Sequence, residues 1–147
     1  MALIKFKALR EGVRMPVYMT AGAAAMDFYS LTDVSVVPGT VTFVPLGLAM
    51  ELPPDKAMLL SARSSHGLKY GAGVPQGFGL IDSDYRNELA MLFTCIKPFD
   101  ICKGERLCQG LVIEAPQHHL ALVSELSPTD RRGGFGSTNH QSGENHG

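Results

Sequence analysis

The sequence predicts an all-β fold, either an antiparallel sandwich or a jelly roll. Short apolar runs follow one another at regular spacing, with Gly, Pro or Asp between them, which is typical of antiparallel β proteins rather than of alternating β and α units. No segment keeps a 3.6-residue apolar period over a long stretch, so we expect little helix. The chain has 147 residues, of which 45% are apolar and 18% charged, and this suits one soluble domain with a sizeable core.

Seven segments are predicted to be strands, and the first two flank a turn at Pro38-Gly39. The segment 88–96 reads Glu-Leu-Ala-Met-Leu-Phe-Thr-Cys-Ile and is apolar on both faces. Such a strand needs cover on both sides, either from a second sheet or from another subunit. In chain order, the predicted strands are residues 34–37, 40–44, 46–52, 56–62, 88–96, 106–113 and 119–126.

The composition excludes several classes of protein. A formal net charge of −1 argues against non-specific binding of nucleic acid, which needs a broad basic face. Charged residues from Lys5 to Glu11 interrupt any signal peptide, and no run reaches the ~18 apolar residues of a membrane span. Cys95, Cys102 and Cys108 lie in apolar segments without CxxC spacing, so we interpret them as buried, reduced thiols. We therefore expect an intracellular protein that is cytoplasmic or also nuclear, and not secreted.

The last part of the chain differs from the rest. We assign residues 1–126 to the β domain and residues 127–147 to a flexible C-terminal arm. The arm has one large apolar residue, Phe135, among Gly, Ser, Thr, Asn, Arg and His. Such a segment cannot bury enough surface to fold alone, so it is either a disordered tail or an arm that orders on a ligand.

The densest chemical signal is the octapeptide from Gly79 to Arg86, Gly-Leu-Ile-Asp-Ser-Asp-Tyr-Arg. It is typical of a hairpin tip, because Asp and Gly favour turns. It also suits a general base, since repulsion between Asp82 and Asp84 can raise the pKa of one carboxyl group. On the octapeptide alone, these two interpretations have about equal weight.

Two further segments can bind phosphate. Residues 63–69 read Arg-Ser-Ser-His-Gly-Leu-Lys and offer cations, hydroxyls and backbone amides, although a solvated loop has the same composition. Gln109 interrupts the apolar strand 106–113. A buried Gln must form hydrogen bonds, so it either ties the structure together or holds a ligand or water.

The fourth segment, from Arg131 to Thr138, combines arginines, glycines and hydroxyl side chains. Glycine lets the backbone wrap around an anion, and arginine neutralises its charge. The segment is not a Walker A motif, because it lacks Gly-Lys-Ser/Thr and a following helix. The alternative is a disordered Gly-rich tail.

Together with the segment from Ala25 to Ser30, these four segments resemble the five ordered motifs of the trimeric dUTP pyrophosphatase family, from about Gly22 to Thr138. The resemblance implies a β jelly roll, also described as a distorted barrel or β-clip, that forms a homotrimer with active sites shared among three chains. It implies hydrolysis of dUTP to dUMP and pyrophosphate, which limits uracil in DNA and supplies dUMP for dTMP synthesis.

The resemblance also assigns roles. Asp82 matches the aspartate that activates water, and Tyr85 matches the tyrosine that excludes a 2′-hydroxyl. Mg²⁺ is expected to be held by phosphate oxygens and water, with Asp27 as a possible support for the metal or for a subunit contact. The remaining residues expected to bind substrate are Arg63, Ser64, Ser65, Gln76, Gly79, Leu80, Ile81, Gln109, Arg131, Phe135, Gly136, Ser137 and Thr138.

Some positions depart from the family pattern. Ser65 replaces a common glycine, Gln76 stands where some members have Asn, and Asn87 replaces the glycine after Asp-Tyr-Arg. The fifth motif is one residue short, so Arg131 and Arg132 compete for the role of phosphate arginine. These differences concern arm geometry and rate more than the class of reaction.

Two alternative functions remain open. A dCTP deaminase shares the fold, but it needs a glutamate after the Asp82 turn, and the expected position holds Leu92. A trimeric interaction or regulatory module could keep the fold without the chemistry. The presence of Asp82, Tyr85 and Gln109 argues against that loss.

Overall fold

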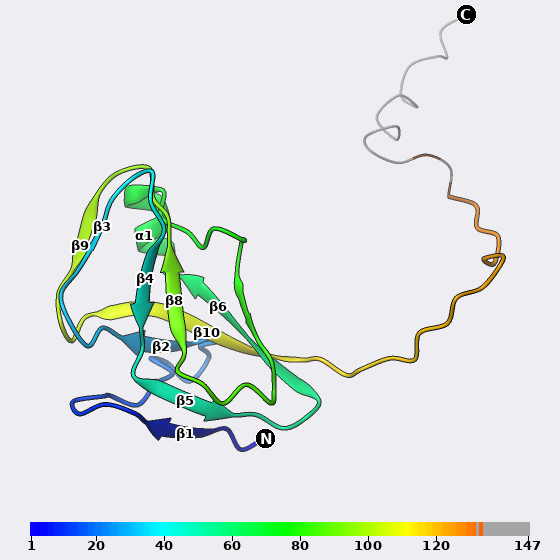
Figure 1. The fold of residues 1–147 in the computed structure, drawn as a ribbon, viewed down its shortest axis with the longest axis horizontal. Coiled ribbons are helices and arrows are strands. Elements are labelled where there is room, and N and C mark those ends of the chain that lie inside the picture. Colours follow the sequence, from blue (N-terminus) through cyan, green and yellow to red (C-terminus); the bar gives the residue numbers. More distant parts are fainter. Residues whose placement is uncertain (132, 134–147) are drawn as a thin grey trace, which may run out of the picture. The chain divides into compact units, whose positions relative to one another are not determined.

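The computed structural model describes residues 1–131 and 133, and Figure 1 shows the fold. The described part consists of short strands and one seven-residue helix, so the all-β class and the low helix content are confirmed. The strands are β1 (Lys5–Ala8), β2 (Met26–Tyr29), β3 (Val34–Val36), β4 (Thr42–Pro45), β5 (Leu48–Glu51), β6 (Lys56–Ala62), β7 (Gly79–Ile81), β8 (Ala90–Phe93), β9 (Phe99–Ile101) and β10 (Arg106–Glu114), and the helix is α1 (Ser64–Tyr70).

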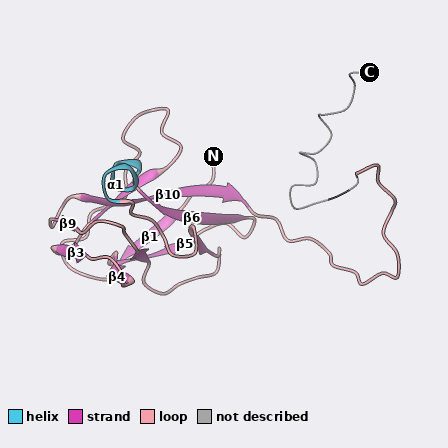
Figure 2. Ribbon diagram, turned by 90° about the horizontal axis from the view of Figure 1, so that it is seen from above, coloured by secondary structure: helices cyan, strands magenta, loops and turns pink. Residues whose placement is uncertain are grey.

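The largest sheet has the order β2-β10-β6-β7, and all its neighbouring strands are antiparallel. Strand β10 is the longest strand and lies between β2 and β6, as Figure 1 shows, and Figure 2 shows β10 beside β6 from above. Three further strand pairs, β1-β5, β3-β9 and β4-β8, complete the sheets of the described residues, and none of these sheets closes into a barrel. Every pairing joins distant parts of the sequence except that of β6 with β7.

The two faces of the large sheet have different surroundings. Side chains alternate between the faces of a strand, so Phe28, Met58, Leu60 and Cys108 point into the core, where each is almost fully buried. The positions between them lie on the opposite face. At the β2 side, this outer face is polar.

Helix α1 is anchored by aromatic packing. The rings of Tyr70 and Phe99 are stacked with their centroids 4.7 Å apart, and the His66 ring lies 5.3 Å from Phe99. Phe93 packs edge-on against Phe99 at 5.9 Å. The helix ends at Gly71, which has φ of 60° and leaves no room for a side chain, because a Cβ there would lie 2.7 Å from Ile96.

Two sequence-based predictions are wrong. Residues 119–126, predicted to be a strand, form no strand in the described chain. Isolated strands need a partner for their backbone groups, and the leucines of this segment are exposed. The expected burial of the cysteines holds for Cys108, whereas Cys95 is half-buried and Cys102 is exposed in the turn before β10. All three are free thiols.

We predict that Gly110→Ala lowers the free energy of unfolding by about 1–3 kcal/mol, the usual cost of overpacking a core. A Cβ at Gly110 would lie 2.8 Å from the Phe28 ring and 2.9 Å from the Met58 sulfur, and both of these side chains are buried. Gly73→Ala is the control, because nothing lies within 4 Å of a Cβ there. Urea unfolding of both variants measures the difference. Equal stability of the two variants would contradict the packing described for β10.

Candidate active site

The carboxylates singled out in the sequence lie on a tight turn after β7. The Tyr85 backbone N–H donates to the Asp82 carbonyl at 3.2 Å, which closes the turn. Asp is favoured at the first position of such turns. The Tyr85 hydroxyl donates to the Glu88 carbonyl at 3.1 Å, so this bond fixes the direction of the phenol ring.

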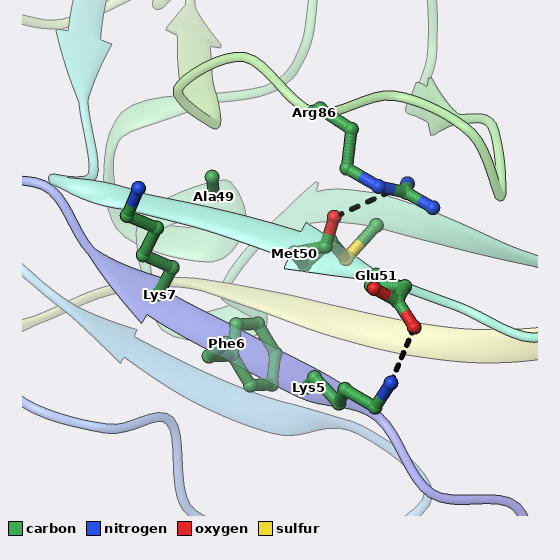
Figure 3. A pocket seen from close by; sticks show the side chains of 7 residues that line it. All are labelled: Lys5, Phe6, Lys7, Ala49, Met50, Glu51 and Arg86. Atoms are coloured by element: carbon green, nitrogen blue, oxygen red, sulfur yellow. Dashed lines mark hydrogen bonds and ion pairs between the residues drawn. The ribbon is translucent and has the colours of Figure 1, made fainter.

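Arg86 holds this turn in place. Its guanidinium donates to the carbonyls of Ser83 at 2.7 Å, Tyr85 at 3.2 Å and Met50 at 3.4 Å, and so ties the turn to strand β5. Figure 3 shows Arg86 reaching Met50 across a cavity of about 380 Å³, with Lys5 paired to Glu51 at its rim. We assign this cavity a structural role, because its arginine is occupied by backbone carbonyls.

A smaller cavity of about 200 Å³ gathers one group of the predicted substrate residues. One wall is the segment from Gln76 to Ile81 with Tyr85, and the other comes from the strand pair β4-β8. Gln76 lies in a turn closed by the Gly77 N–H and the Val74 carbonyl at 2.9 Å. The residues lining the cavity are Phe43, Leu60, Val74, Gln76, Gly79, Leu80, Ile81, Tyr85, Ala90, Met91 and Leu92.

Asp82 faces a neighbouring cavity of about 580 Å³ that is also lined by Ser83, Asp84 and Lys56. The Lys56 ammonium pairs with Asp55 and Glu114, both at 2.7 Å. Both carboxylates on the turn are exposed, so water can reach them. The predicted base therefore lies next to the small cavity, since Ile81 and Tyr85 on either side of it line that cavity.

A second group of predicted residues forms a polar cluster on the outer face of the large sheet. Asp27, Gln109 and Ser61 are directly opposite one another on β2, β10 and β6. The Gln109 amide donates to the Ser61 hydroxyl at 3.4 Å. The Asp27 carboxylate lies 3.2 Å from Arg106 and 3.8 Å from Arg63, so two cations surround one anion.

Ser64 and Ser65 open helix α1 directly after Arg63, which has extended backbone angles. The segment 63–69, for which a solvated loop was the alternative to a phosphate site, therefore forms most of a helix, and among the described hydrogen bonds neither serine hydroxyl has a partner. Burial, and next the charge of Arg63, lower the pKa of His66, whose Nδ1 is buried without a partner in the described structure. Its imidazole is accordingly neutral near pH 7.

The two groups lie at opposite ends of β6. Gln109 is opposite Ser61, whereas Asp82 follows Ile81, which is opposite Met58. Strand spacing puts Asp82 and Gln109 roughly 13 Å apart along β6 and roughly 10 Å apart across it. A hydrogen bond spans about 3 Å, so one phosphate cannot contact both residues of the same chain.

Of the arm residues predicted to bind substrate, Arg131 lies within the described chain and the others lie outside it. Arg131 is exposed, and its backbone N–H donates to the Thr129 hydroxyl at 3.0 Å. Phe135, Gly136, Ser137 and Thr138 lie outside the described residues, as does Arg132. Sequence reasoning missed Arg106 as part of the polar cluster, although it begins the predicted strand 106–113 that contains Gln109, and a register shift in β10 follows it.

A protein-held metal ion needs several carboxylate, imidazole or thiolate ligands close together. Among residues 1–131 and 133, no three His, Cys, Asp or Glu side chains are grouped to hold a metal ion. Asp27 is paired with two arginines. In the same part of the chain, no helix is both long enough and apolar enough to cross a membrane.

Comparison with known proteins identifies the family. The dUTPase family model matches residues 11–139. The deoxyuridine 5'-triphosphate nucleotidohydrolase of Nautilia profundicola is 37% identical over 138 residues, covering 92% of this chain and 97% of the relative. The enzyme of the same name from Caldanaerobacter subterraneus is 36% identical, with 84% and 87% of the two chains covered.

Solved structures agree in fold. The dUTPase of Staphylococcus bacteriophage 80alpha with dUpNHpp superposes with a TM-score of 0.81 at 22% identity, covering 92% of this chain and 98% of the other. A dUTPase from phage phi11 of S. aureus, described with a structural Mg(II) ion, has a TM-score of 0.77 at 19% identity, with 84% and 97% covered. On the family match and on relatives of 36–37% identity over most of its length, the chain belongs to the dUTPase family.

Proposed function

We propose that this chain hydrolyses dUTP to dUMP and pyrophosphate. The observation that carries the proposal is the 200 Å³ cavity in which Gln76, Gly79, Ile81 and Tyr85 converge beside the Asp82 turn. Family membership supports the same reaction, since the relatives are named for hydrolysis of this nucleotide.

Recognition of the base is proposed to use the backbone of β7. Within the described residues, this strand is at the edge of its sheet and pairs with β6 alone. Half of its N–H and C=O groups therefore lack a sheet partner, and they can form hydrogen bonds with the polar edge of uracil. Gln76 adds an amide that can donate and accept at the same cavity.

Selection of the sugar is proposed for Tyr85. Its ring lines the cavity, and its hydroxyl is already bound to the Glu88 carbonyl. A ring held in this way packs against deoxyribose and cannot move aside for a 2′-hydroxyl. The selection is steric.

The chemical step is proposed to be attack of water on the α-phosphorus. Asp82 accepts a proton from the water, the water oxygen bonds to phosphorus, and the bond from the α-phosphorus to the bridging oxygen breaks. Pyrophosphate leaves with that bridging oxygen. Asp82 suits this role because it is exposed to water. It also lies beside the 200 Å³ cavity, which we term the nucleoside cavity.

The polar cluster is proposed to hold the phosphates. Arg63 and Arg106 exceed Asp27 by one charge, and Ser64, Ser65 and Gln109 add donors nearby. Bound Mg²⁺ would be held by phosphate oxygens and water and would offset phosphate charge, while Asp27 orients the two arginines instead of binding the metal. The segment containing Arg131, Phe135, Gly136, Ser137 and Thr138 is proposed to close over the nucleotide.

We propose a homotrimer in which each site takes the nucleoside cavity from one chain and the polar cluster from another. The separation of these two groups along β6 supports sharing. The exposed leucines of residues 118–126 and the exposed Leu80 and Leu111 offer apolar surface for assembly. The three free thiols are consistent with a reducing, intracellular location.

The alternatives are less well supported. Leu92 lines the nucleoside cavity, at the place where a deaminase would need its glutamate. A leucine cannot transfer protons at the base. A non-catalytic module has no need for a water-accessible Asp82 beside a cavity of nucleoside character.

The reaction is tested by measuring pyrophosphate release from dUTP, dCTP, dTTP and UTP, with ammonia release from dCTP as a parallel assay. We expect hydrolysis of dUTP far above hydrolysis of the other nucleotides, and no ammonia.

Asp82→Asn keeps the shape of the side chain but cannot accept a proton, so it should lower kcat by ~10²–10⁴-fold without loss of dUTP binding. Asp84→Asn is the control. Near-normal turnover by Asp82→Asn would assign the base elsewhere.

The role of Tyr85 gives a separate prediction. Tyr85→Ala should raise UTP hydrolysis relative to dUTP hydrolysis, because the space for a 2′-hydroxyl opens. Tyr85→Phe retains the ring but loses the bond to the Glu88 carbonyl, so its discrimination should lie between those of Tyr85→Ala and the unmodified protein. The ratio of kcat/KM for the two substrates measures this effect. Equal hydrolysis of UTP and dUTP by the unmodified protein would show that Tyr85 does not select the sugar.

A further inference from the structure

The nucleoside cavity has a second wall, opposite the segment that contains Gln76 and Ile81. It is formed by the strand pair β4-β8, in which Phe43 is directly opposite Leu92. Side chains that are directly opposite on an antiparallel pair share a face, so Phe43 and Leu92 line the cavity together. Behind them, Val44 and Met91 point into the core.

Phe43 is unusually exposed for its type. Its side chain is 66% accessible, although the strand that carries it is otherwise well packed. The neighbouring Thr42 and Pro45 are half-buried, and Val44 is buried. A large aromatic side chain that is exposed beside a cavity is placed to cover a ligand.

The chemistry of the cavity indicates which part of the substrate it accepts. None of the eleven described residues that line it is charged. Such a surface suits a flat, uncharged base and its sugar, and it offers nothing to phosphate. The charged groups proposed for phosphate lie at the other end of β6.

We propose that Phe43 packs against the nucleoside half of the substrate, as the wall opposite the hairpin, and that it sets affinity for the nucleoside. This inference rests on the proposed hydrolysis of dUTP. Phe43 takes no part in the proton transfer or in phosphate binding. Its contribution therefore enters substrate binding and leaves the chemical step unchanged.

The test compares Phe43→Ala with Val41→Ala. Val41 is 56% exposed two residues earlier and does not line the cavity, so it is a matched control. Stacking of a base on an aromatic ring predicts that Phe43→Ala raises KM for dUTP by roughly 5–100-fold. We expect kcat to change by less than about threefold, which is small beside the loss of a catalytic group. Phe43→Leu, which keeps apolar cover, should recover part of the affinity.

Inorganic triphosphate as a competitive inhibitor separates nucleoside contact from a general disturbance of the site. It lacks a base and sugar, so its inhibition constant should be the same in Phe43→Ala as in the unmodified protein. An unchanged KM, a parallel loss of triphosphate inhibition, or a changed assembly mass in Phe43→Ala would each overturn the inference. Failure of the proposed function itself is seen separately, as absence of pyrophosphate release from dUTP by the unmodified protein.

Discussion

The site depends on the antiparallel pairing of strand β6 with β10 on one side and β7 on the other. This pairing sets Gln109 against Ser61 and leaves Asp82 beyond Met58, at the opposite end of β6. A slip of one residue would turn every side chain of a strand to the other face, so the register is fixed by the buried side chains of Met58, Leu60 and Cys108. Core packing therefore decides where the proposed base and the residues proposed to bind phosphate lie.

Charge pairing positions the side chains of the polar cluster at one end of this arrangement. Asp27 is 9% exposed and contacts Arg63 from the end of β6 and Arg106 from the start of β10. A nearly buried carboxylate is stable only with such partners, and it holds both guanidiniums on the outer face of the sheet. Burial raises the pKa of the Cys108 thiol on the core side, and the negative charge of Asp27 raises it further. Arg86 has the corresponding role at the other end, where it ties the turn of Asp82 to β5.

The sequence predicted the elements whose signal is local. The apolar runs 56–62 and 106–113 correspond to β6 and β10, and the Asp82 motif lies on a turn, which was one of its two interpretations. The short strands β1, β2, β7 and β9 were not predicted, because a segment of three or four residues carries too little pattern of its own and forms a strand only by pairing, as Lys5 does with Glu51. The reverse error occurred at residues 119–126, where a strand-like pattern finds no partner in the described chain. The residues of the motifs identified Asp82 and Gln109 singly, and only the family resemblance implied shared sites; the separation of the two residues along β6 follows from the sheet register.

The central claim is that the nucleoside cavity and the polar cluster of one site come from different chains. Mixing two inactive proteins tests it most directly. Asp82→Asn removes the proposed base, and Ser64→Ala combined with Gln109→Ala removes donors from the phosphate end. In randomly mixed 1:1 trimers, about one quarter of the sites draw both intact groups, because each of two independent chains is the right type with odds of about one half. We predict recovery of activity to about a quarter of that of the unmodified protein. No recovery, with mixed trimers confirmed by mass, would contradict the shared site.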